Sequence, residues 1–205
     1  LFRGTKQINP RRDYISRVII GAIQHNIAIY SAHTNLDNAP QGVNHRIGEL
    51  LDLLDIAPLA PLSGSQTAGL DPAFANRCGS GIVGMLPLEM NAYSFVQMFK
   101  ERFHVDALMA NAEDVNIDRM IRKVALCGGA GDDFINDAVR QGADVFLTGE
   151  CGYHLYFGHP EILILCAGHY ETEQYTSQLL KDLIQEQYPD LSIQIARKSS
   201  PVVVL

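Results

Sequence analysis

The fold is decided by residues 123–168, KVALCGGAGDDFINDAVRQGADVFLTGECGYHLYFGHPEILILCAG, in which apolar runs alternate with more polar segments. The apolar runs are KVALCG at 123–128, DVFLTG at 144–149 and ILILCAG at 162–168. Each run is continuously apolar, which is typical of strands buried on both faces of a parallel or mixed sheet. The segments between the runs are long enough for crossover helices. The sequence therefore predicts an α/β fold.

The rest of the chain continues this alternation of helices and strands. Apolar residues at helical spacing predict helices over 13–26, after Gly42, over 94–103 and from about Thr172 to Tyr188. Strands are predicted at 27–33, 79–86, 105–110, 191–196 and 202–205. The Pro-rich residues 57–72 can sustain neither a helix nor a central strand, so we expect a surface connection and a candidate domain boundary there.

Composition narrows the classes of partner. The 205-residue chain is 47% hydrophobic and can bury a core without disulfides or a structural metal. Its net charge of −7 argues against a nucleic-acid partner, although a small anionic ligand such as a nucleotide stays compatible. The four cysteines lack CxxC spacing, so we expect reduced thiols and a cytoplasmic location. We expect no membrane span, because no apolar run approaches the roughly 18 residues that a span needs. We also expect no signal peptide, because LFRGTKQ at 1–7 lacks the layout of one.

An imidazole and a carboxylate, four residues apart, follow each of three predicted strands. The pairs are His33 with Asp37, Glu150 with His154, and His169 with Glu173. Residues four apart share a face of a helical turn, and ligands of open α/β sheets gather beyond the carboxyl ends of the strands. Histidine nitrogen and carboxylate oxygen are suited to Zn, Mn, Fe and related divalent ions, and the same groups can transfer protons. If the strands are neighbours, the sequence predicts a metal site centred on His169, Glu173 and Asp37.

Each pair also has a purely structural interpretation. His33 and Thr34 could close a turn and cap the next segment, with Asn35 and Asp37 supplying the turn chemistry, and for Asp37 this interpretation is as good as metal binding. His154 lies in an aromatic run, so a hydrogen-bonded core or interface histidine is as good an interpretation as a ligand. Glu173 could be only a favourable charge in a first helical turn, but that leaves His169 unexplained. The pair of His169 and Glu173 is therefore the strongest.

The glycine-rich residues 128–133, GGAGDD, follow one predicted strand and open a helix. Such a layout can hold a phosphate on backbone amides, but the stretch matches neither GxGxxG nor the Walker pattern. Asp132 and Asp133 would cap a helix and repel a phosphate. A tight turn from strand to helix is therefore the favoured interpretation.

Three stretches resemble the signature motifs of the Nif-three-like family, also called GTP cyclohydrolase one type two. They are YSAHTNLDNAPQGVN at 30–44, GADVFLTGECGYH at 142–154 and AGHYETE at 167–173. The resemblance implies two intertwined α/β lobes, each a mostly parallel or mixed sheet flanked by helices, which we place at 1–118 and 119–205. It also implies a site for two metals between the lobes and a homohexamer.

The resemblance gives Asp37, His169 and Glu173 as metal ligands, with His33 and His154 near the metals. Glu150 departs from the family pattern, in which Asp is usual. Two further ligands of the family belong to a His-His-Pro stretch upstream of a segment that resembles LFRGTKQ at 1–7, so two metals per subunit are expected if those histidines are present.

Two functions of different classes follow from these residues. The first is a metal-dependent hydrolase that resembles GTP cyclohydrolase, in which His154 or Glu150 moves protons. The second is a metal carrier or regulatory interaction protein without turnover. Affinity for GTP or a related nucleotide separates the two, because a carrier needs none. A metal-free scaffold with a decayed site is a third possibility.

Overall fold

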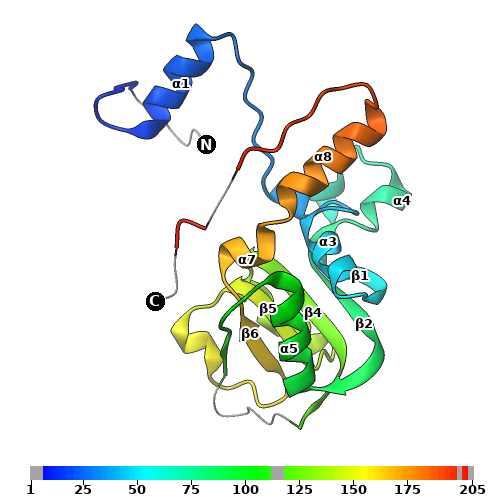
Figure 1. Cartoon of the computed structure of the whole chain (residues 1–205). Helices are drawn as coiled ribbons and strands as arrows, with labels where there is room; N and C mark the ends of the chain where they lie inside the picture. The colour runs from blue at the N-terminus through cyan, green and yellow to red at the C-terminus, as the bar shows by residue number, and fades with distance from the viewer. Residues whose placement is uncertain (1–6, 112–117, 198–199, 203–205) are drawn as a thin grey trace. The chain divides into compact units, whose positions relative to one another are not determined.

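The computed structural model describes residues 7–111, 118–197 and 200–202 (Figure 1). The chain divides into two compact units, Leu1–Asn35 and Leu36–Leu205, whose relative positions are not determined. The first unit contains α1, Tyr14–Gln24, where a helix is predicted. Asp13 caps this helix by accepting a hydrogen bond from the Ser16 backbone N–H at 2.7 Å.

The strand predicted at 27–33 is not formed, so this prediction is wrong. Its alternation of apolar side chains fits a strand, but a strand also needs a neighbour to pair its backbone N–H and C=O groups. Among the described residues of the first unit, no strand is present that could pair with this segment. Accordingly, Ile27, Ile29 and Tyr30 are exposed.

The second unit is built on a six-stranded mixed sheet with the order β1-β2-β4-β5-β6-β3. The strands are β1 (Leu54–Pro61), β2 (Gly79–Asn91), β3 (Met109–Ala110), β4 (Met120–Ala130), β5 (Val145–Glu150) and β6 (Leu163–Cys166). The β4, β5 and β6 strands run parallel, whereas the pairs β1–β2, β2–β4 and β3–β6 are antiparallel. The α/β class is confirmed, and the apolar runs that predicted it form the parallel part of the sheet.

Helices cover both faces of this sheet. The helices α3 (Val43–Leu50), α5 (Ala92–Phe103) and α8 (Thr176–Gln187) pack on one face, and α6 (Ile135–Arg140) packs on the other. Figure 1 shows α5 lying across the sheet. Along β5, Val145 and Leu147 face the α5 side, whereas Phe146 faces the α6 side. Burial on both faces explains why the central strands are continuously apolar.

The prediction of a surface connection over the Pro-rich residues 57–72 is wrong in part. Residues 54–61 form β1 rather than a connection, and β1 lies at the edge of the sheet. Proline is tolerated on an edge strand, because its missing N–H can face away from the neighbouring strand. The exclusion of a central strand therefore holds. The chain then continues through a 3-10 turn, Gly64–Thr67, and the short helix α4, Pro72–Ala75.

The end of the chain also departs from prediction. The helix predicted from Thr172 is divided into α7, His169–Glu173, and α8. Between them the Gln174 side-chain amide donates to the Phe103 carbonyl at 2.9 Å. Residues 191–196 form no strand, since no described strand pairs with them, and 203–205 lie outside the described residues. The strand predicted at 105–110 is reduced to β3.

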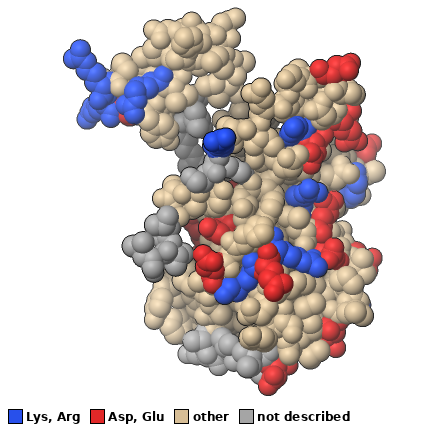
Figure 2. All heavy atoms as spheres, in the orientation of Figure 1, with Lys and Arg blue, Asp and Glu red and all other residues tan. Residues whose placement is uncertain are grey.

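The division into intertwined lobes at 1–118 and 119–205 is not confirmed, because strands from both ranges share the one sheet. The boundary itself stays a prediction. Among the described helices, none has the length and apolarity needed to cross a bilayer. On the face that Figure 2 shows, acidic and basic side chains are interspersed over the second unit.

A buried threonine fixes the end of β4 to β5. Thr148 is fully buried, and its Oγ1 accepts a hydrogen bond from the Gly131 N–H at 3.0 Å. Its hydroxyl donates to the Gly129 carbonyl at 3.2 Å or to the Glu150 carbonyl at 3.3 Å. The turn that follows β4 is thereby held in place.

We predict that Thr148→Val lowers the free energy of unfolding by about 1–3 kcal/mol, because a buried N–H loses its acceptor while the side-chain shape is kept. Urea denaturation followed by circular dichroism measures this change. The control is Thr67→Val, whose half-buried hydroxyl donates to the Gly64 carbonyl at 3.2 Å within a surface turn. Equal losses in the two variants would contradict a special role for Thr148.

Candidate metal centre

His169 lies between two carboxylates at the carboxyl end of the parallel strands. It is the first residue of α7, which directly follows β6. Its Nε2 is 3.3 Å from Glu173 Oε2 one turn along the helix, and its Nδ1 is 2.6 Å from Glu150 Oε1 at the end of β5. The structure therefore unites members of two of the predicted pairs in one chain of polar contacts.

Glycines allow α7 to approach the ends of β4 and β5. Gly129 has a φ of +64°, and a Cβ there would lie 2.4 Å from Glu173 Oε1 and 3.2 Å from His169 Nε2. A Cβ on Gly149 would lie 2.9 Å from His169 Cα. Side chains at either position would displace the two polar groups, so only glycine fits.

The amides of the glycine-rich turn are engaged within the protein. The Gly128 N–H donates to Asn44 Oδ1 at 2.8 Å, and the Gly129 N–H donates to the buried Thr172 Oγ1 at 3.0 Å. The Gly131 N–H is held by Thr148, as described above. These amides therefore bond within the protein. The turn itself is shorter than predicted, because β4 continues to Ala130 and the 3-10 turn Asp132–Phe134 leads into α6 without a side-chain cap from either aspartate.

Asp37 reaches the same end of the sheet. It is the last residue of α2, Thr34–Asp37, and its backbone carbonyl accepts a hydrogen bond from Asn44 Nδ2 at 3.2 Å. Burial, together with the negative charges of Asp37 and Glu173, raises the pKa of the Cys127 thiol to about 12. Both carboxylates therefore lie near Cys127, close to the end of β4.

The remaining predicted residues are placed differently. His33 belongs to the first unit, and its backbone N–H donates to Asn35 Oδ1 at 2.8 Å, as in the predicted turn. His154 is exposed in the 3-10 turn Tyr153–Tyr156, where its ring faces Gly152. In the described part of the chain, no hydrogen bond or ion pair joins His154 to His169.

The described side chains do not adopt the arrangement of a complete metal site. Within residues 7–111, 118–197 and 200–202, no group of three or more His, Cys, Asp or Glu side chains is close enough together to hold a metal ion. The structure shows the contacts of His169 with Glu173 and Glu150, and Asn44 joins the Asp37 carbonyl to Gly128 at the end of β4.

The two carboxylates control the protonation of His169. Its partial burial lowers the pKa, but the hydrogen bond to Glu150 and the negative charges of Glu173 and Glu150 outweigh burial, so that the pKa rises above 6.5. A positive charge is therefore favoured between Glu150 and Glu173.

Comparison with known proteins shows the family of this chain. Residues 1–201 match the family model described as Duf34/NIF3 (NGG1p interacting factor 3). The chain belongs to the DUF34/NIF3 family. A Nostoc sp. protein named GTP cyclohydrolase 1 type 2 homolog is 32% identical over 155 residues, which are 75% of this chain and 54% of that protein. A protein of the same name from Streptococcus pneumoniae is 30% identical over 155 residues, 75% of this chain and 53% of that protein.

This DUF34/NIF3 chain thus spans about half the length of those two relatives. A crystal structure of a Bacillus cereus protein related to NIF3 is similar with a TM-score of 0.83 and 22% sequence identity. That likeness covers 100% of this chain and 80% of the other, and it shows the fold.

Sequence reasoning missed the residues that hold the site together. They are Asn44, Thr148, Gly149 and Thr172. No metal-ligand pattern includes these residue types, because each acts through a hydrogen bond or through the absence of a side chain. The only indication of their importance in the sequence was their position inside the three motifs, in GVN at 42–44, LTGE at 147–150 and HYETE at 169–173.

We predict that His169 of the metal-free protein titrates above its ordinary value of 6.5. Because the folded pKa is raised, protonated His169 stabilises the protein below 6.5, and this stability is lost as the pH rises through the folded pKa. NMR titration of the imidazole measures the pKa. Glu150→Gln removes one negative charge and should lower it.

The control is Glu161→Gln, since Glu161 lies 3.8 Å from the ring of His159 and should not affect His169. A His169 pKa at or below 6.5 in the wild-type protein, or one that Glu150→Gln leaves unchanged, would contradict the role given to Glu150.

Proposed function

We propose that this protein binds a divalent metal ion at the carboxyl end of its parallel strands through His169, Glu173 and Asp37. The observation that carries the proposal is the 2.6 Å contact between Glu150 Oε1 and His169 Nδ1. A carboxylate on Nδ1 holds the proton on that nitrogen and leaves the lone pair of Nε2 available. Nε2 then faces Glu173 Oε2 at 3.3 Å, and a cation relieves the repulsion between two electron-rich atoms.

The donor set suits the proposed ions. One imidazole nitrogen with carboxylate oxygens matches Zn, Mn, Fe and related divalent metals. Glu150 orients His169 from the side away from Glu173, which is how carboxylates commonly support metal-binding histidines. Glu150 is thus a positioning residue in this proposal, rather than the proton carrier that the sequence suggested.

The reaction class that fits is metal-dependent hydrolysis. A divalent metal bound there would supply Lewis-acid chemistry, which polarises a carbonyl or phosphoryl oxygen of the substrate. His154 is exposed on the loop after β5 and would move a proton to or from the substrate. Asp37, His169 and Glu173 would hold the metal throughout.

The names of the relatives suggest the substrate. Proteins named GTP cyclohydrolase 1 type 2 homolog are about 30% identical to this chain, so we propose GTP or a related nucleotide. By the same resemblance we propose His33 near the metals, a second metal if the upstream histidines are present, a homohexamer and intertwined lobes. From the expected reduced cysteines we propose a cytoplasmic location.

Titration of the metal-free protein with Mn²⁺ or Zn²⁺ in a calorimeter tests this proposal. We predict that the wild-type protein binds the ion, and that His169→Ala and Glu173→Ala weaken binding by at least about 10-fold while the circular dichroism spectrum is kept. The matched control is the double variant of His45→Ala with Glu49→Ala. This pair has the same spacing and the same 3.3 Å contact, but on α3.

Failure of the wild-type protein to bind either ion contradicts the proposal, as does equal weakening in the control. Addition of GTP to the metal-loaded protein separates the two classes of function. Nucleotide binding with hydrolysis supports the enzyme, whereas exchangeable metal without nucleotide affinity supports the carrier.

A further inference from the structure

The side-chain amide of Asn44 connects the Asp37 segment to the end of β4. Asn44 lies in the first turn of α3 and is only 2% exposed. Its Nδ2 donates to the Asp37 carbonyl at 3.2 Å, and its Oδ1 accepts from the Gly128 N–H at 2.8 Å. A single buried group therefore joins the residue proposed as one ligand to the strand end that contacts His169 and Glu173.

We propose that Asn44 is a positioning residue that sets the distance between Asp37 and the pair formed by His169 and Glu173. This inference rests on the proposed metal binding and assigns to that site a residue that contacts no metal. It implies that loss of Asn44 weakens metal binding although every proposed ligand is still present.

The loop around Asp37 is compact and is held at a second point. A Cβ on Gly42 would lie 1.8 Å from the Leu36 carbonyl oxygen, so residues 36–42 close into a tight loop. The Asn38 carbonyl accepts from the Gly79 N–H at 3.0 Å, and Asn38 Oδ1 accepts from Ser80 Oγ at 3.0 Å. Asn38 thus fastens the loop to β2, whereas Asn44 fastens Asp37 to β4, the strand that contacts α7.

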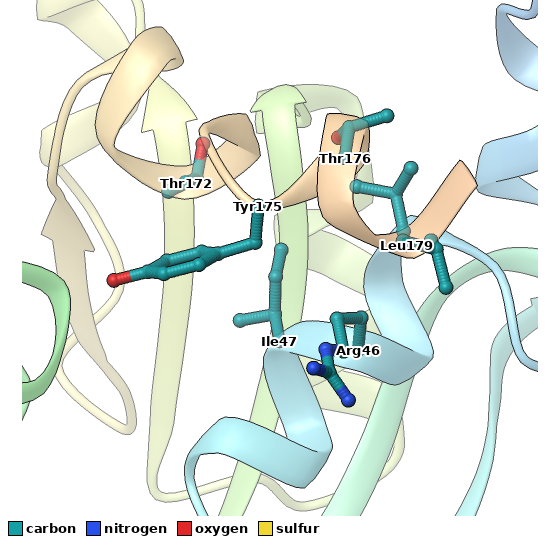
Figure 3. A pocket seen from close by; sticks show the side chains of 7 residues that line it. Arg46, Ile47, Thr172, Tyr175, Thr176 and Leu179 are labelled. Atoms are coloured by element: carbon teal, nitrogen blue, oxygen red, sulfur yellow. The ribbon is translucent and has the colours of Figure 1, made fainter. Parts of the chain in front are cut away.

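Asn44 itself is placed by the packing of α3 against α7 and α8. Figure 3 shows Ile47 pointing from α3 toward Thr172 and Tyr175, across a small hollow that Leu179 also lines. A Cβ on Gly128 would lie 2.8 Å from Ile47 Cδ1, so α3 also lies directly against the end of β4. The helix that carries Asn44 and the helix that carries His169 are therefore packed on the same strand end.

Asparagine is suited to this position because one planar group supplies both a donor and an acceptor. An aspartate could accept from Gly128 but could not donate to Asp37, and it would add a buried negative charge. Alanine would leave the Gly128 N–H and the Asp37 carbonyl without this partner. The Asp37 carboxylate would then lose its fixed position relative to α7.

A matched control exists in Asn111. It is fully buried, its Nδ2 donates to the Ile162 carbonyl at 3.0 Å, and its Oδ1 accepts from the Ile164 N–H at 2.8 Å. Asn111 thus makes the same two kinds of backbone contact as Asn44, but at β6 and without a bond to Asp37 or β4. Replacing it should affect stability alone.

The experiment compares Asn44→Ala with Asn111→Ala by Mn²⁺ titration calorimetry and by urea denaturation. Both variants should lower the denaturation midpoint. Asn44→Ala should raise the Mn²⁺ dissociation constant by about 10- to 100-fold, the range seen when groups that support metal ligands are removed. Asn111→Ala should leave the constant within about twofold of the wild-type value. Asn44→Ser, whose hydroxyl keeps one bond, should weaken binding less and serves if Asn44→Ala does not fold.

The outcomes separate this inference from the proposed function. If the wild-type protein binds no Mn²⁺, the proposed function fails and the inference fails with it. If the wild-type protein binds Mn²⁺ but the Asn44 variants bind equally well, or if Asn111→Ala weakens binding as much as Asn44→Ala, only the role of Asn44 is overturned.

Discussion

The close contact of α7 with the glycine-bearing ends of β4 and β5 is the constraint on which the rest of the site depends. Gly129 and Gly149 have no side chains, so the His169 backbone and the Glu173 carboxylate approach the strands directly. Thr172, buried on the inner face of α7, accepts the Gly129 N–H and fixes the helix there. The ends of β4 and β5 thus form the surface on which α7 packs, and α7 carries His169 and Glu173.

This contact determines the electrostatics of the site. Glu150 ends β5 and bonds to Nδ1 of His169, while Glu173 faces Nε2 of the same ring. An imidazole between two carboxylates favours a positive charge, which either a proton or a metal ion supplies. Asp37 adds a third carboxylate near the same strand end, and its negative charge contributes to the raised pKa of Cys127. Three carboxylates around one imidazole favour the binding of a cation.

Patterns that are local in the sequence were predicted well. The apolar runs of β4, β5 and β6 gave the fold class because burial on both faces requires continuous apolar residues. The four-residue spacing of His169 and Glu173 placed them on one helical face, as the structure shows. The strand at 27–33 was predicted wrongly, because its formation depends on a pairing partner that a local pattern does not reveal. Likewise, the contact of Glu150 with His169 and the bridge made by Asn44 join residues distant in sequence, which residue spacing alone does not identify.

The position of a bound metal ion tests most directly whether His169, Glu173 and Asp37 are the ligands. Anomalous X-ray diffraction from crystals of the protein grown with Zn²⁺ locates the ion without reference to activity. We expect a peak about 2.0–2.1 Å from His169 Nε2, with carboxylate oxygens of Glu173 and Asp37 beside it and Glu150 still on Nδ1. A peak on Nδ1, a peak at His154 alone, or no peak near α7 would contradict it.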